Sequence, residues 1–121
     1  MMRKITHGGL KKTIKDYLSA QGCLVIDHYN GAIRGQRGWF AQPNKGTSDI
    51  IALSVNGVFI GIEVKCGKDT PSPAQEDFLK RVNANEGVGI VARCLEDVEK
   101  LFFTEGEETP NPAALKCVPQ N

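Results

Sequence analysis

A hairpin signal in the middle of the chain constrains the fold more than any other feature. The pair Asn56-Gly57 separates two apolar runs rich in β-branched residues, 50–55 and 58–62. An Asn-Gly pair between such runs is the strongest short-range signal for two antiparallel strands joined by a tight turn. The hairpin places Asp49, just before the first strand, beside Glu63 and Lys65 at the end of the second.

The length of this turn decides whether the charged side chains share a face of the sheet. Side chains alternate along a strand, so Glu63 and Lys65 share one face and Val64 takes the other. A strict two-residue turn pairs Asp49 with Val64, on the wrong face. A three-residue loop or a bulge pairs Asp49 with Glu63 instead. We therefore predict the longer loop, or an Asp49 just outside the regular pairing.

Apolar periodicity on both sides of the hairpin predicts one α/β domain, a mixed β-sheet flanked by helices in the order α-β-β-β-α-β-α. Residues 31–48, which hold four glycines, are expected to form a long loop. The predicted elements are a helix over 6–20 with Thr6 as its cap, a strand over 23–26, the two hairpin strands, a helix over 73–85, a strand over 88–92 and a short helix from about residue 95.

Composition is that of an ordinary globular domain, with 121 residues, 40% hydrophobic and 24% charged. We predict a domain over 1–104 and a loosely structured tail over 105–121, where Gly, Glu, Pro and Asn dominate. No apolar run approaches the roughly 18 residues of a membrane span, and the N-terminus lacks a secretory signal. The four cysteines show no Cys-x-x-Cys spacing, which predicts reduced thiols in a cytoplasmic protein.

Charge is distributed unevenly along the chain. Residues 1–48 carry eight Lys or Arg against two Asp, although the formal net charge of the whole chain is only +1. Such a half can form a basic face for nucleic acid. It can equally be the solvated side of the first helix, and the sequence leaves both interpretations open.

Four motifs in order carry a family resemblance: Gly-x-x-Asp at 46–49, the hairpin, Glu63-x-Lys65, and the helix start Ser-Pro-x-Gln at 72–75. Together they resemble the VRR-NUC (virus-type replication-repair nuclease) branch of the PD-(D/E)XK nuclease superfamily, over most of the chain. The resemblance implies a restriction-endonuclease-like fold and a DNA endonuclease that depends on Mg²⁺ or Mn²⁺. It also implies a homodimer that cuts branched DNA such as four-way junctions, in replication or repair.

The predicted catalytic residues follow from the chemistry of phosphodiester hydrolysis. The carboxylates of Asp49 and Glu63 can bind a divalent metal, with the carbonyl of Val64 as a third ligand. Lys65 can orient the attacking water or stabilise the transition state. No Gly-rich nucleotide motif is present, so we expect no small-molecule cofactor.

Two further residues have alternative interpretations. By resemblance Gln75 belongs to the site, whereas by local physics it is the partner of Ser72 in a capping box. The family usually has a Glu at the start of its first helix, and this chain has none there. His7 lies nearest that place, as a possible additional site residue or as an ordinary surface histidine.

Nucleic-acid contacts are predicted in the glycine-rich segment and on the first helix, where cationic side chains suit phosphate oxygens. Trp39 can stack on an unpaired base, or with Phe40 it can pack the loop onto the domain. A catalytically silent nucleic-acid-binding module remains the alternative function. The predicted nucleic-acid-binding residues are Asn30, Arg34, Arg37, Trp39, Lys45, Lys11 and Lys12.

Overall fold

The computed structural model describes residues 5–28, 33–35, 38–40, 46–104 and 106–115, and for 33–35 and 38–40 it describes the backbone alone. The elements are α1 (His7–Ala20), β1 (Leu24–Ile26), β2 (Ile33–Gly35), β3 (Gly38–Phe40), β4 (Ile50–Leu53), β5 (Phe59–Val64), α2 (Pro73–Ala84), β6 (Val88–Ala92), α3 (Leu95–Glu99) and a 3-10 turn (Lys100–Phe102).

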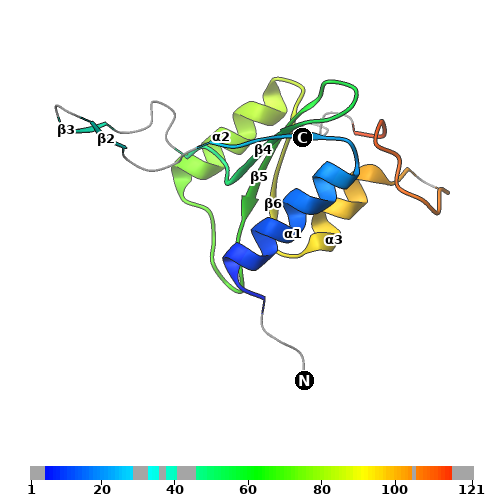
Figure 1. Cartoon of the computed structure of the whole chain (residues 1–121), viewed down its shortest axis with the longest axis horizontal. Coiled ribbons are helices and arrows are strands. Elements are labelled where there is room, and N and C mark those ends of the chain that lie inside the picture. The colour runs from blue at the N-terminus through cyan, green and yellow to red at the C-terminus, as the bar shows by residue number, and fades with distance from the viewer. Residues whose placement is uncertain (1–4, 29–32, 36–37, 41–45, 105, 116–121) are drawn as a thin grey trace.

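The predicted mixed sheet flanked by helices is confirmed. Its strand order is β1-β4-β5-β6, with β1–β4 and β4–β5 antiparallel and β5–β6 parallel. Helix α2 makes the crossover between the parallel strands β5 and β6, as parallel neighbours require. Figure 1 shows α2 on one side of the sheet and α1 with α3 on the other. The domain is therefore a three-layer α/β sandwich.

The long connection expected over 31–48 contains two strands that were not predicted from the sequence. Strands β2 and β3 pair antiparallel in a separate two-stranded sheet. Each has three residues and a glycine at one end. Strands this short show too little alternation for periodicity to detect them. The segment between β1 and β4 thus carries a small hairpin that projects from the domain (Figure 1).

The turn between β4 and β5 has the longer loop that the register argument predicts. Ile50 pairs with Ile62 and Ala52 with Ile60, and the backbone N–H of Ser54 donates to the carbonyl of Val58 at 3.0 Å. Three residues, 55–57, therefore form the loop. Gly57 within it has φ +81°, a left-handed conformation that glycine adopts without steric cost.

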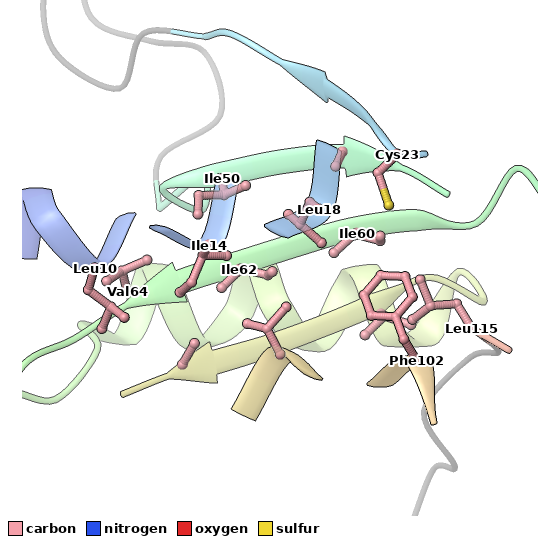
Figure 2. Close-up of a cluster of buried hydrophobic side chains, with 14 residues drawn as sticks. Leu10, Ile14, Leu18, Cys23, Ile50, Ile60, Ile62, Val64, Phe102 and Leu115 are labelled. Atoms are coloured by element: carbon pink, nitrogen blue, oxygen red, sulfur yellow. The ribbon is translucent and has the colours of Figure 1, made fainter. Parts of the chain in front are cut away.

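The main hydrophobic core lies between the sheet and the helices α1 and α3. The apolar stripe of α1, Leu10, Ile14 and Leu18, is fully or almost fully buried. Figure 2 shows it packed over the inward-facing side chains of β4 and β5. Thr6 caps this helix as predicted, because its hydroxyl accepts from the N–H of Gly9 at 3.0 Å. Packing against the sheet fixes where the helix begins, and so where His7 lies.

Part of the segment beyond residue 104 belongs to this core. Leu115 is 1% exposed and lies near Phe102 at one end of the cluster (Figure 2). Its carbonyl accepts from the side-chain amide of Asn56 at 3.2 Å. The boundary between domain and tail after residue 104 stays a prediction, and the contacts of Leu115 favour a later one. Among the described helices, none is long and apolar enough to cross a membrane.

Candidate active site

Asp49 is held at the start of β4 by the neighbouring strand. It lies one residue before the first paired residue, Ile50. Its carboxylate Oδ2 accepts a hydrogen bond from the backbone N–H of Val64 at 2.9 Å, so the side chain continues the β4–β5 ladder where the backbone pairing has stopped. The carboxylate is 17% exposed. Hydrogen bonds from N–H groups to a carboxylate are strong and directional, and this one aims the carboxylate at the end of β5.

Glu63 is buried beside Asp49. It is only 2% exposed, and its Oε2 atom has no hydrogen-bond partner among the described residues. Burial, followed by repulsion from the Asp49 carboxylate, raises the pKa of Glu63 to about 7, while the positive charge of Lys65 opposes the rise. A buried carboxylate oxygen without a partner costs free energy. Above this pKa the site holds two adjoining negative charges, and a cation between the two carboxylates would relieve their repulsion.

Lys65 lies on the same side of β5 as Glu63, as strand alternation predicts. Its Nζ is 3.5 Å from Oε1 of Glu63 and its side chain is 19% exposed. The backbone N–H of Lys65 donates to the carbonyl of Ala92 at 3.1 Å, so it lies where β5 leaves the sheet. The ammonium group is thus partly shielded from water, close to one carboxylate and open to a ligand that approaches the site.

Gln75 completes a capping box and also contacts Glu63 of the candidate site. Its Oε1 accepts from the backbone N–H of Ser72 at 2.8 Å, and its own N–H donates to the Ser72 hydroxyl at 3.2 Å, which completes a capping box at the start of α2. Its Nε2 donates to Oε1 of Glu63 at 2.9 Å. The cap fixes which end of the amide faces the site, because the oxygen is already engaged. The start of the helix thus orients a donor toward the buried carboxylate.

This double role predicts different outcomes for two substitutions. Gln75→Glu keeps an acceptor for the cap but removes the donor to Glu63 and adds a like charge. We expect the pKa of Glu63 to rise further in this variant, with stability at pH 5 close to that of wild type. Gln75→Ala also removes the side-chain acceptor for the N–H of Ser72, and should lose about 1 kcal/mol of stability, the usual net contribution of one hydrogen bond. Carboxyl ¹³C NMR titration and thermal melts at pH 5 measure the two effects. An unchanged pKa of Glu63 in Gln75→Glu would show that Gln75 is a cap alone.

Gly46 brings the segment before Asp49 against the first turn of α2. It has φ +78°, and a Cβ built on it would lie 2.2 Å from the carbonyl oxygen of Ala74 and 2.7 Å from the backbone nitrogen of Gln75. No side chain fits there, so the Gly of the Gly-x-x-Asp motif permits close approach of two backbones. Glycine at position 46 therefore lets the segment that leads to Asp49 pack directly against the helix that carries Gln75.

His7 lies at the site rather than elsewhere on the surface. Its Nε2 is 3.3 Å from Oδ2 of Asp49, and its side chain is 51% exposed. No acidic residue occupies the first turn of α1, as the sequence indicates. The helix start that carries a Glu in the family therefore presents an imidazole to Asp49 in this chain.

The predicted nucleic-acid-binding residues are only partly described. Asn30, Arg37 and Lys45 lie outside the described residues, and Arg34 and Trp39 are described by their backbone, where they pair across β2 and β3. On α1, Lys12 is exposed and its Nζ pairs with Asp16 at 2.8 Å, while Lys11 is half-buried. Within the described part of the chain, the side chains of Asp49 and Glu63 make polar contacts with His7, Val64, Lys65 and Gln75 rather than with these two lysines. Their roles stay predictions.

One contact at the site has no signal in the sequence. Nε2 of His28 lies 2.6 Å from the carbonyl oxygen of Ser48, the residue before Asp49. Ser48 is fully buried, and its hydroxyl donates to the carbonyl of Ile50 at 3.0 Å. His28 follows β1 by two residues and stands twenty positions from Ser48, a separation at which no local motif connects them.

The donor set suits a hard divalent cation with few protein ligands. Two carboxylates adjoin, and one of their oxygens is buried without a partner. Within the described ranges, no group of three or more His, Cys, Asp or Glu side chains could hold a metal. The remaining ligands would have to be backbone carbonyls or waters, which is the usual coordination of Mg²⁺ in proteins. The three described cysteines are free thiols, so no thiolate site competes.

The architecture of this chain is similar to that of a solved structure. The chain superposes on a "VRR_NUC domain" with a TM-score of 0.57 and 24% sequence identity, over 78% of this chain and 91% of that one. This chain has a VRR-NUC fold. The fold implied by the motifs is thereby confirmed. No protein-family model matches the sequence, and no curated protein matches it either. Because identity is low, the VRR-NUC fold is shared while the roles of individual residues stay predictions.

Proposed function

We propose that this protein is a metal-dependent nuclease that hydrolyses phosphodiester bonds in DNA. The observation that carries the proposal is the meeting of Asp49 and Glu63, with one Glu63 oxygen buried and unpartnered and Lys65 3.5 Å from the other. The VRR-NUC fold supports it. Asp49, Glu63 and the carbonyl of Val64 would hold Mg²⁺ or Mn²⁺, which would lower the pKa of a bound water and offset charge on the scissile phosphate.

Three further side chains of the site would stabilise the transition state or orient the two carboxylates. Lys65 places a positive charge where negative charge grows on the phosphate in the transition state, which is electrostatic preorganisation. Gln75 orients the Glu63 carboxylate through the amide whose other end caps α2. His7 positions the Asp49 carboxylate from the exposed side. These residues come from α1, the start of β4, α2 and the end of β5. The fold is therefore needed to bring them together.

For the substrate, we propose branched DNA cut by a homodimer. The proposal follows the resemblance to small VRR-NUC proteins, since two sites related by a dyad can nick opposite strands of a four-way junction. Cationic residues of the 29–45 segment and of α1 would contact the phosphate backbone. Measuring solution mass beside cleavage of labelled junctions, flaps, hairpins and linear duplex would test both parts.

Asp49→Asn tests the metal-dependent mechanism. Asparagine keeps an oxygen that accepts from the N–H of Val64, so the fold should survive, but it removes one charge from the metal site. We expect wild type to cleave DNA with Mg²⁺ or Mn²⁺ and not with EDTA, and the variant to lose at least about 10²-fold in rate. Asp27→Asn, which removes one charge from a carboxylate that is 95% exposed and outside the proposed metal site, is the matched control.

The same assay separates the alternative function. A catalytically silent nucleic-acid-binding module would bind the DNA panel without cleaving any member in either metal. The absence of a carboxylate from the first turn of α1 favours this alternative. Binding without cleavage by wild type, at protein concentrations that saturate the DNA, would replace the nuclease proposal with it.

A further inference from the structure

We infer that His28 is a positioning residue for Asp49, acting through the carbonyl of Ser48; this rests on the proposed nuclease function. The contact is short, 2.6 Å between Nε2 and the carbonyl oxygen. A carbonyl oxygen can only accept, so the imidazole must donate, and its Nε2 carries the proton. The other ring nitrogen, Nδ1, is 3.4 Å from the carbonyl of Ile26, a longer contact.

The hydrogen bond between His28 and Ser48 lies where the pairing of β1 with β4 ends, beside Asp49. Strands β1 and β4 pair as far as Ile26 with Ile51. In the same register, the next positions on β1 and β4 would bring residue 28 opposite Asp49. Backbone pairing has ended there, and the His28 side chain bonds the β4 segment in its place. On the other side of β4, the Asp49 carboxylate extends the β4–β5 pairing in the same way.

Fixing the Ser48 carbonyl fixes the backbone that carries Asp49. The peptide unit between the two residues is planar, so the orientation of its C=O sets the position of the Asp49 Cα and N–H. The buried Ser48 hydroxyl adds a second restraint through Ile50. With the peptide held, the carboxylate can keep its 2.9 Å bond to Val64 without searching other rotamers. A site held within about 0.5 Å by such supporting contacts is preorganised for its chemistry.

The same hydrogen bond joins the two ends of the segment that is predicted to bind DNA. His28 precedes residues 29–45 and Ser48 follows them. This segment contains the predicted contacts Arg34, Arg37 and Trp39. His28 therefore lies at the junction between the segment proposed to bind DNA and Asp49, a proposed metal ligand.

The test compares metal-free full-length variants by NMR. His28→Leu removes the donor, and His28→Gln restores an N–H near the position of Nε2. We expect the Val64 amide proton to move upfield and to exchange about tenfold faster in His28→Leu, because its acceptor is no longer held. His28→Gln should recover most of the wild-type values. Asp27→Asn, next in sequence and 95% exposed, should leave them unchanged.

A second measurement keeps the inference testable if His28→Leu does not fold. The imidazole ¹⁵N spectrum of wild type should show a proton on Nε2 with hydrogen-bonded character. A tautomer protonated on Nδ1 alone would overturn the inference. So would an unchanged Val64 amide in folded His28→Leu, which would leave the residue with a role in loop closure only.

Metal binding and cleavage distinguish failure of this inference from failure of the proposed function. If both hold, His28→Leu should weaken Mn²⁺ binding about tenfold, with a lower kcat and a smaller change in KM, and His28→Gln should recover both. If wild type neither binds Mn²⁺ nor cleaves DNA, the nuclease proposal fails. The Val64 amide and the imidazole tautomer then still decide whether His28 positions Asp49.

Discussion

Replacing Lys65 by Met should abolish cleavage while leaving metal binding intact. Methionine keeps much of the stem that packs beside Glu63 and removes only the ammonium group, 3.5 Å from the carboxylate. Because a cation beside the site repels a bound metal ion, Mn²⁺ affinity should stay the same or rise slightly. The rate of DNA cleavage should fall by about 10²–10³-fold, the usual loss when one preorganised electrostatic contact to the transition state is removed.

Single-turnover cleavage with saturating Mn²⁺ measures this prediction, alongside Mn²⁺ titration of the metal-free protein. Lys80→Met, at an exposed position on α2, is the matched control and should behave as wild type in both. Cleavage within about tenfold of wild type would remove Lys65 from the proposed chemistry. A parallel loss of Mn²⁺ binding would assign it a structural role instead.

Glu63 makes the stability of the metal-free protein depend on pH in the opposite sense to an ordinary surface carboxylate. Its pKa is about 7 in the folded chain against 4.5 as its ordinary value. Between these values the folded state binds more protons than the unfolded state, so the free energy of unfolding falls as pH rises. The loss begins near pH 4.5 and is complete above pH 7. Its size is on the order of 3 kcal/mol, because each pKa unit corresponds to about 1.4 kcal/mol.

Glu63→Gln isolates this effect, since glutamine resembles the protonated acid at every pH. At pH 4 the variant and wild type should have similar stability. At pH 8 without metal the variant should be more stable by about 3 kcal/mol, which for a domain of this size raises Tm by roughly 10 °C. Chemical denaturation in EDTA over pH 4–8 measures the difference. Glu108→Gln, an exposed carboxylate in the described chain, should show none.

A divalent ion should reverse the order at pH 8. Binding to the folded state alone stabilises by about 4.1 kcal/mol at a free concentration of 1,000 times Kd, which exceeds the advantage of roughly 3 kcal/mol that the variant has without metal. Mg²⁺ or Mn²⁺ should therefore raise the Tm of wild type and leave that of Glu63→Gln almost unchanged. Equal shifts in both proteins would mean that the ion binds elsewhere. A wild type whose stability rises steadily from pH 5 to 8 in EDTA would contradict the burial of Glu63 as the source of strain.

The order of the main elements follows from local patterns in the sequence. The Asn56-Gly57 signal predicts the hairpin, and the requirement that Asp49 meet Glu63 predicts its three-residue loop, which the pairing of Ile50 with Ile62 confirms. The Ser-Pro-x-Gln start predicts the capping box of α2. Each of these depends on residues within a single hairpin or a single helix start, at most fourteen positions apart. The strands β2 and β3 were not predicted, because a strand of three residues shows almost no alternation of apolar and polar side chains.

Contacts between distant segments were decided only by the tertiary structure. His28 reaches Ser48 across twenty residues, and His7 reaches Asp49 across forty-two. The sequence offered a cap or a site role for Gln75, and only packing of α2 over β5 shows that one amide serves both. The sequence determines which functional groups are available. Which oxygen is buried without a partner depends on how the layers pack, because burial is a property of neighbours that lie far apart along the chain.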